Sequence, residues 1–232
     1  MGKYQQTIDI NAHNSIAHIL KNVRPNSTVV EFGPASGYMT QYLKESLGCK
    51  VTIVELDYTD GLEASKYADE SLIGYPDGDI EMWQWINFHP VDHVIFSDVL
   101  EHLRDPWKVL ARAAKITKDD GSIFISVPNV GHNSVIIDLI NNKFTYRKTG
   151  LLDNTHLRFF TRESLTQMVV DAGLIIENEF NTYCAVEHTE FQNSLQDIPE
   201  SVASVLQDRV DGNLYQFVWE LKKKKEQNVL SI

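Results

Sequence analysis

The sequence predicts a single α/β domain built on a doubly wound, mostly parallel sheet of seven strands, with helices on both faces. Three observations carry this prediction. Apolar strand-like runs alternate with amphipathic helical segments along most of the chain, a pattern that implies right-handed crossovers between parallel strands. A glycine turn follows the first strand, and an acidic residue ends the second, as in open sheets that bind nucleoside cofactors.

The first half of the chain supplies the first three strands. A helix over 13–21 follows a polar segment, and Pro25 breaks it, so residues 1–24 form an N-terminal helical arm. The remaining elements expected here are a strand over 28–32, a helix over 38–46, a strand over 50–56, a helix over 59–68, a weak strand over 72–74 and a short helix over 82–86.

The second half adds four strands and two insertions. A strand over 93–98 leads to a helix that Asp105 caps and Pro106 begins, running to about Ile116. Later elements are a strand over 122–127, a helix over 161–172 and strands over 174–179 and 214–221. The stretch 129–160 is too long for an ordinary connection. We expect it to form a lid on the acceptor side, and 187–212 to form a second, helical insertion.

Composition excludes several classes of protein. The 232 residues suit one domain, and the net charge of −11 argues against a large nucleic-acid footprint, which needs a basic face. The sequence has no apolar run near 18 residues, so no membrane span is expected, and its polar first residues lack a signal-peptide core. Cys49 and Cys184, without metal or disulfide spacing, are typical of a reducing cytoplasm. The oligomeric state stays open.

The stretch from Val29 to Thr40 is the centre of the functional prediction. It reads as a strand, a tight turn over Gly33–Gly37 and the start of a helix, where backbone amides can meet a negative group. The spacing is E-F-G-x-x-x-G rather than the G-x-G-x-x-G of dinucleotide binders. Glu55 lies 22 residues after Gly33, where such folds hold the ribose hydroxyls.

A second motif follows the strand over 93–98. The run D-V-L-E-H-L-x-D-P begins at Asp98, and a later strand reads G-S-I-F-I-S-V-P-N. With the glycine turn, these motifs resemble class I S-adenosylmethionine (SAM)-dependent methyltransferases, including the ubiquinone-biosynthesis O-methyltransferase group. The resemblance covers about residues 25–180 and implies a Rossmann-like fold with SAM as cofactor.

The resemblance also assigns cofactor-binding positions. Glu31 matches the family's acid two residues before the first glycine, the turn borders the methionine moiety, and Glu55 takes the ribose hydroxyls. The full set that the resemblance implies is Glu31, Gly33, Pro34, Ala35, Gly37, Glu55, Leu56 and the pair Asp79 and Ile80 near the adenine, with Ser97 and Asp98 after the fourth predicted strand.

Methyl transfer to a hydroxyl needs alignment and removal of one proton, and histidine is the natural base near neutral pH. The candidates are His102, in the loop after the strand over 93–98, and His156, in the polar part of the insertion. Alternatively, His102 caps a helix or contacts SAM, and His156 anchors the loop. Some ubiquinone-group relatives hold a divalent metal on positions matching Asp98, Glu101 and His102, but capping contacts are the preferred explanation for these residues, and no metal is predicted.

The segments P-N-V-G-H-N-S-V and G-L-L-D-N-T-H-L-R-F-F-T resemble a methyltransferase subgroup found with surface-glycan and sugar-modifying enzymes. This implies an O-methylated sugar, sugar phosphate or glycan precursor as acceptor. Asn129, His132 and Arg158 are then candidate substrate-binding residues, with Arg158 able to grip an anion. The same residues could instead tie the insertion to the body of the domain.

Two other functions stay open from the sequence. An NAD-dependent oxidoreductase shares the strand-turn-helix and the ribose acid, although the third glycine is missing. A non-catalytic SAM-binding partner module would keep the glycine turn and Glu55 but methylate nothing.

Overall fold

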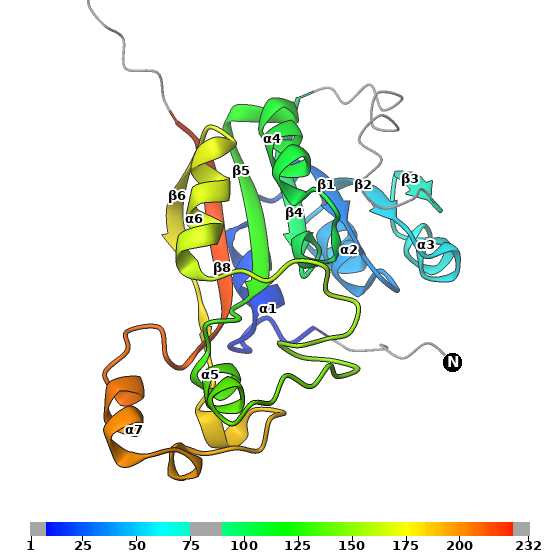
Figure 1. The fold of residues 1–232 in the computed structure, drawn as a ribbon. Coiled ribbons are helices and arrows are strands. Elements are labelled where there is room, and N and C mark those ends of the chain that lie inside the picture. Colours follow the sequence, from blue (N-terminus) through cyan, green and yellow to red (C-terminus); the bar gives the residue numbers. More distant parts are fainter. Residues whose placement is uncertain (1–7, 75–89, 225–232) are drawn as a thin grey trace, which may run out of the picture.

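A computed structural model describes residues 8–74 and 90–224. Its centre is one sheet, in which the described strands follow the order β3-β2-β1-β4-β5-β8-β6, with the short β7 paired to β8 (Figure 1). The strands are β1 (Thr28–Phe32), β2 (Lys50–Glu55), β3 (Glu70–Ile73), β4 (Val91–Ser97), β5 (Thr117–Pro128), β6 (Leu174–Glu179), β7 (Thr182–Tyr183) and β8 (Leu214–Lys223).

The sheet is mostly parallel, as predicted. β1 pairs in parallel with both β2 and β4, and the order reverses between β1 and β4. β8 runs antiparallel to β5 on one side and to β6 on the other. The switch point therefore lies at the carboxyl ends of β1 and β4, where open sheets of this kind bind ligands.

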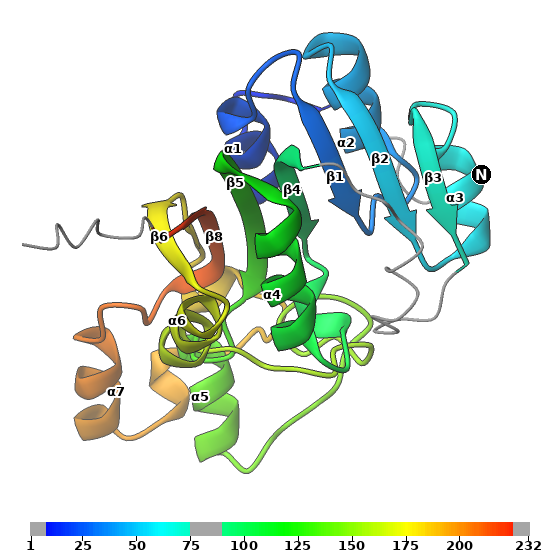
Figure 2. The ribbon, with the colours of Figure 1, turned by 90° about the horizontal axis from the view of Figure 1, so that it is seen from above.

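Helices cover both faces of the sheet (Figure 2). α4 and α6 lie on one face, and α1, α2 and α3 lie on the other. The helices are α1 (Ser15–Asn22), α2 (Tyr38–Gln41), which continues as a π-helical turn (Tyr42–Ser46), α3 (Tyr58–Ala64), α4 (Pro106–Ile116), α5 (Asn133–Ile140), α6 (Arg162–Asp171) and α7 (Glu200–Gln207).

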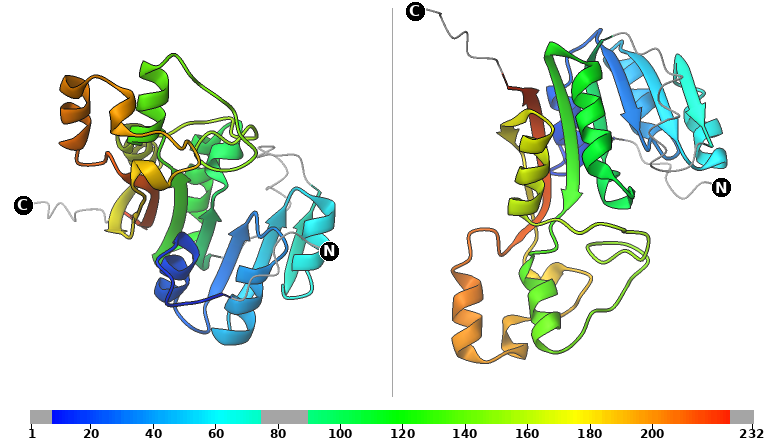
Figure 3. Two further views of the ribbon diagram at one scale, coloured as in Figure 1. Left: turned by 90° about the horizontal axis from the view of Figure 1, so that it is seen from below. Right: turned by 45° about the horizontal axis from the view of Figure 1, so that its top comes forward.

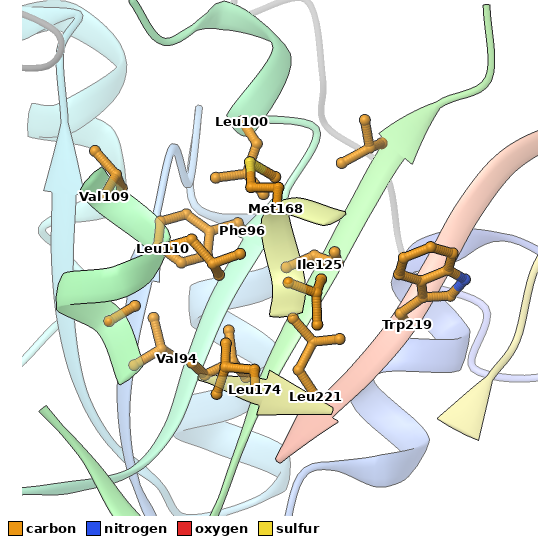
Figure 4. Packing of buried hydrophobic residues seen from close by; sticks show 14 of the residues in the cluster. Val94, Phe96, Leu100, Val109, Leu110, Ile125, Met168, Leu174, Trp219 and Leu221 are labelled. Carbon is orange, nitrogen blue, oxygen red and sulfur yellow. The ribbon is translucent and has the colours of Figure 1, made fainter. Parts of the chain in front are cut away.

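Each face has its own apolar core. Figure 4 shows Phe96 of β4 and Leu110 of α4 in the cluster beneath α4 and α6, to which α6 contributes Met168. On the opposite face, Ile19 of α1 and Leu43 of the π-helical turn pack in the second cluster. Strands with buried side chains on both faces explain the nearly continuous apolar runs that predict them.

Two helix starts follow from capping chemistry. The Asp105 carboxylate accepts the Lys108 amide at 3.2 Å, with Pro106 at the first helical position. Thr161 and Ser164 form a reciprocal capping box at the start of α6. The sequence predicted the first start from Asp105 and Pro106 and the second at residue 161, and both are confirmed; the part of Ser164 was not predicted.

Several boundaries differ from the sequence prediction. β5 begins at Thr117 rather than at 122, and β3 begins at Glu70 rather than at 72. The helix predicted over 59–68 ends at Ala64, followed by turns. The described part of the chain has one strand more than the seven predicted, the short β7. Its two residues are too few to produce a recognisable alternation of apolar side chains. The helix predicted over 82–86 lies outside the described residues.

The two insertions lie together beyond the carboxyl edge of the sheet, where α5 and α7 appear below the strands in Figure 1 and in the right view of Figure 3. Ile137 of α5 packs with Leu206 of α7 and with Val186 and Ile198 of the connecting segment in a separate apolar cluster. The insertions thus form one small packed unit at the ligand edge. No described helix has the length and apolar character needed to cross a bilayer.

Candidate active site

The glycine turn connects β1 to α2 at the switch point. Gly33 and Gly37 have φ angles of +63° and +83°, which favour glycine, and the Gly37 amide donates to the Pro34 carbonyl at 2.9 Å. A Cβ at Gly37 would lie 2.5 Å from Ala64 Cα, and one at Gly33 would lie 2.7 Å from a Val99 methyl. The turn is therefore packed against α3 and the loop after β4 with no room for side chains.

Glu55, at the end of β2, holds the turn in place. One carboxylate oxygen accepts the Ala35 amide at 3.0 Å, and the other accepts the Asp57 amide at 2.9 Å. Burial raises the pKa of Glu55, while these amide hydrogen bonds act in the opposite direction. Each carboxylate oxygen keeps a further lone pair for a ribose hydroxyl. The next residue, Leu56, leaves 52% of its surface exposed, as an adenine-contacting residue in an open site would.

Glu31 is fully buried beneath the turn. Its Oε2 atom accepts the Thr40 hydroxyl at 2.7 Å, whereas its Oε1 atom has no hydrogen-bond partner among the described residues. Burial raises the pKa of Glu31 to about 7. Buried polar atoms are almost always paired, so an orphaned carboxyl oxygen here fits a site that a ligand or its bound water completes. The turn, Glu55 and Glu31 together fit the predicted SAM site.

The loop after β4 borders the same edge. Asp98 takes a left-handed backbone conformation with φ of +55° and donates its amide to the Ser126 hydroxyl at 3.0 Å. Its exposed carboxylate accepts a hydrogen bond from the Gln216 side chain. The Ser97 hydroxyl lies 3.3 Å from that of Ser126. β5 and β8 thus fix the loop that the sequence assigns to the cofactor.

The two candidate bases lie next to each other. The rings of His102 and His156 meet edge to face with centroids 4.8 Å apart, although 54 positions separate them in the sequence. The His102 Nδ1 atom lies 3.3 Å from the Thr155 carbonyl. Both rings are partly exposed. The structure therefore unites in one site two residues that the sequence offered as alternatives.

Backbone hydrogen bonds create this pairing. The Glu101 carbonyl accepts two amides from the insertion, Leu157 at 2.8 Å and Arg158 at 2.9 Å. The Arg158 guanidinium donates to the Arg104 carbonyl and lies 5.8 Å above the Trp107 ring. These contacts fasten the insertion to the loop after β4, so Arg158 performs the tying role that was its alternative interpretation.

The Glu101 carboxyl group is the most unusual group of the site. It is 1% exposed, and neither oxygen has a hydrogen-bond partner in the described part of the chain. Burial, with Asp98 nearby, raises its pKa well above the usual value. Glu101, His102 and His156 each offer a ligand atom within 4.8 Å of the others. Such a carboxylate and imidazole set suits a divalent cation.

Burial also affects the pKa of the His156 imidazole. Burial and then the neighbouring His102 lower the pKa of His156. The pKa of the neighbouring Asp153 is lowered overall. Burial alone would raise this pKa, but hydrogen bonds from Thr155 and the charge interaction with the two imidazoles outweigh that effect. His156 is therefore neutral near pH 7, which is the form that can take a proton.

Asn129 and His132 lie inside the protein. The Asn129 side chain donates to the Leu214 carbonyl at 2.8 Å and accepts the Gly131 amide at 2.9 Å. His132 is fully buried, its Nδ1 atom accepting the Ser134 amide and its Nε2 atom facing the Cys184 carbonyl. Burial lowers its pKa, so the neutral ring donates from Nε2. These contacts support the alternative that both residues tie the insertion to the body.

Two predicted cofactor residues, Asp79 and Ile80, lie outside the described residues. The sequence interpretation gave Glu101 only a minor role, as a possible metal ligand or a capping residue. Its position directly before His102 was visible in the sequence, but its approach to His156 depends on the insertion, which binds the Glu101 carbonyl from a distant part of the chain.

Comparisons with known proteins give matches to methyltransferases. The family model described as a methyltransferase domain matches residues 9–179. Ubiquinone biosynthesis O-methyltransferases of Nitrosospira multiformis and Hydrogenovibrio crunogenus are each 24% identical to this chain, over 155 and 154 residues. The alignments cover 64% and 66% of this chain and 63% and 64% of those relatives. The chain thus spans slightly under two thirds of their length.

Solved structures share the fold. A methyltransferase from a complex with the Haloferax volcanii Trm112 activator superposes with a TM-score of 0.59 at 18% identity, covering 92% of this chain and 90% of that one. A Burkholderia thailandensis 1,6-didemethyltoxoflavin N1-methyltransferase gives 0.55 at 17% identity, covering 94% and 80%. At these identities the likeness concerns the fold alone.

Proposed function

Because the chain belongs to the methyltransferase-domain family, whose class I members use SAM, we propose that it transfers a methyl group from SAM to a hydroxyl of a small polar acceptor. The observation that carries the hydroxyl assignment is the His102–His156 pair, partly exposed at the carboxyl edge beside the loop after β4. The relatives' printed name, O-methyltransferase, supports oxygen as the methylated atom.

The chain's residues divide the work between binding and proton removal. SAM, when bound, supplies a methyl group already activated on a positively charged sulfur. The glycine turn and Glu55 would hold the nucleoside and methionine parts, and the insertion would exclude water from the acceptor. The imidazole of His156 or of His102 would take the proton that the acceptor hydroxyl loses as its oxygen bonds to the methyl carbon.

A sugar, sugar phosphate or glycan precursor is the acceptor class that we propose. The support is the resemblance of the segments around Asn129 and His156 to methyltransferases that accompany sugar-modifying enzymes. The relatives named for ubiquinone biosynthesis favour a different small-molecule acceptor class. Both classes present a hydroxyl whose proton must be removed, so the base assignment is the same for either.

A divalent cation on Glu101, His102 and His156 is the second candidate for the proton-removal step, favoured by the unpartnered Glu101 oxygens and the 4.8 Å grouping. The cation would lower the pKa of an acceptor hydroxyl. An imidazole that binds a cation through its free nitrogen cannot also take a proton there. The two roles are therefore separable by experiment.

The test is turnover with methyl-labelled SAM and a panel of sugars, sugar phosphates and phenols, with and without EDTA. Label in a sugar product would support the proposal, and label only in a phenol would replace the acceptor class. SAM binding without turnover on any acceptor, in protein supplied with Mg²⁺, Mn²⁺ or Zn²⁺, would favour the non-catalytic binding module. Activity that survives EDTA supports the imidazole base, whereas loss restored by one metal supports the cation.

A further inference from the structure

A pocket lies away from the glycine turn, between the insertion over 129–160 and the segment that precedes α7. Its volume is about 430 Å³, within the range of small-molecule sites. Nearly all of its lining is polar and includes Asp138, Lys143, Arg147 and Asn193. None of the residues assigned to SAM, and neither His102 nor His156, lines it. We call it the insertion pocket.

Two cations of the insertion pocket have no carboxylate partner in the described part of the chain. Lys143 is exposed, and Arg147 is half-buried with its Nε atom lacking any hydrogen bond there. The Arg147 guanidinium lies 4.8 Å above the Phe191 ring, which orients its planar set of donors. Its backbone is fixed on both sides, by the Leu152 carbonyl and the Asn154 amide, each at 2.8 Å. An oriented guanidinium without a partner matches a phosphate or carboxylate.

The same pocket carries acceptors for hydroxyl groups. Asn193 is 9% exposed and donates to the Asp138 carboxylate and the Ser134 carbonyl, both at 2.8 Å. The side-chain amide oxygen of Asn193, Oδ1, has no hydrogen-bond partner among the described residues. Asp197 adds a second carboxylate, of which one oxygen accepts the Ser194 amide at 2.8 Å. Carboxylate and amide oxygens with spare lone pairs suit a ligand with several hydroxyl donors.

From this combination we propose that the insertion pocket binds an anionic, hydroxyl-rich small molecule, a sugar bearing a phosphate or a carboxylate. A simple anion would leave the acceptors of Asp138 and Asp197 facing negative charge. A neutral sugar would leave Lys143 and Arg147 without a counter-charge. The proposal goes beyond the methyl-transfer function, because it does not require that the occupant of the insertion pocket be methylated.

The test is calorimetric titration of the intact chain with glucose 1-phosphate, glucuronate, glucose and inorganic phosphate. We expect one of the two charged sugars to bind at least tenfold more tightly than glucose or phosphate. Lys143→Gln and Arg147→Gln should each weaken that binding at least tenfold. Lys148→Gln is the matched control, because Lys148 is an exposed neighbour that does not line the pocket, and binding there should stay within twofold.

Three results would overturn the proposal. These are no binding of either charged sugar, binding of phosphate as tight as that of the sugar phosphate, and unchanged binding in Lys143→Gln. The last variant stays decisive even if Arg147→Gln fails to fold, because Lys143 is exposed and its side chain has no hydrogen bond or ion pair among the described residues. Binding of S-adenosylhomocysteine (SAH), measured separately, distinguishes failure here from failure of the proposed function.

Discussion

Replacing Gly37 with alanine tests whether the packed glycine turn is what binds SAM. Gly37 has a φ of +83°, and its added Cβ would lie 2.5 Å from Ala64 Cα, a backbone atom that cannot move aside. The left-handed conformation costs an alanine about 1–2 kcal/mol. Displacing α3 adds about 1–3 kcal/mol, as for other overpacked sites. Real Cβ atoms do not come this close to a backbone carbon, so the turn or α3 must shift to relieve the contact.

Gly173→Ala is the matched control. Gly173 has a φ of +74°, close to that of Gly37, but a Cβ there meets no atom within 4 Å. Both variants carry the conformational cost, and only Gly37→Ala carries the contact with Ala64. Urea denaturation should therefore show Gly37→Ala to be less stable than Gly173→Ala by about 1–3 kcal/mol.

The functional readout is SAH affinity by calorimetry on the folded variants. Gly37→Ala should bind at least tenfold more weakly than the unmodified chain, which corresponds to about 1.4 kcal/mol. Gly173→Ala should stay within twofold. If Gly37→Ala folds and binds SAH as tightly as the control does, the turn is not the cofactor cradle and the site assignment fails.

Three further predictions follow from the buried carboxyl groups and the histidine pair. Glu55→Gln should weaken SAH binding roughly ten- to a hundredfold, because a carboxylate that accepts two backbone amides is lost. The control is Glu70→Gln, exposed on the edge strand β3, for which calorimetry should show no change in SAH affinity. Burial raises the pKa of Glu31 from 4.5 to about 7, so between these pH values the folded state keeps a proton that the unfolded state releases. The free energy of unfolding should therefore fall by about 3 kcal/mol as the pH rises from 4.5 to above 7. If urea denaturation of Glu31→Gln showed the same dependence of that free energy on pH, the result would contradict this assignment. In metal-free protein, His102→Gln should raise the pKa of His156 toward its usual value, because burial and then His102 lower it, and a downward shift in the histidine NMR titration would refute the pairing.

Local chemistry accounts for the parts of the fold that the sequence predicted well. Asp105 and Pro106 start α4, and the glycine turn closes β1, because capping, a fixed φ and a left-handed φ are properties of a few adjacent residues. Apolar runs located β1, β4 and β5 for a similar reason, since strands buried on both faces leave little choice of residue.

Long-range contacts explain what the sequence left undecided. His102 and His156 were alternatives because their meeting depends on two hydrogen bonds to the Glu101 carbonyl from residues more than fifty positions away. Asn129 and His132 looked suited to a polar acceptor, yet β8 and the segment around Cys184 bury them. Residue type alone does not reveal which polar side chains a distant segment will cover.

The most direct test of the central claim is a crystal structure of the complex with SAH. We expect the ribose hydroxyls on the Glu55 carboxylate, the methionine part along the turn from Gly33 to Gly37, and the sulfur facing the side on which His102 and His156 meet. A complex in which SAH lies elsewhere, or in which its sulfur faces away from both imidazoles, would contradict it.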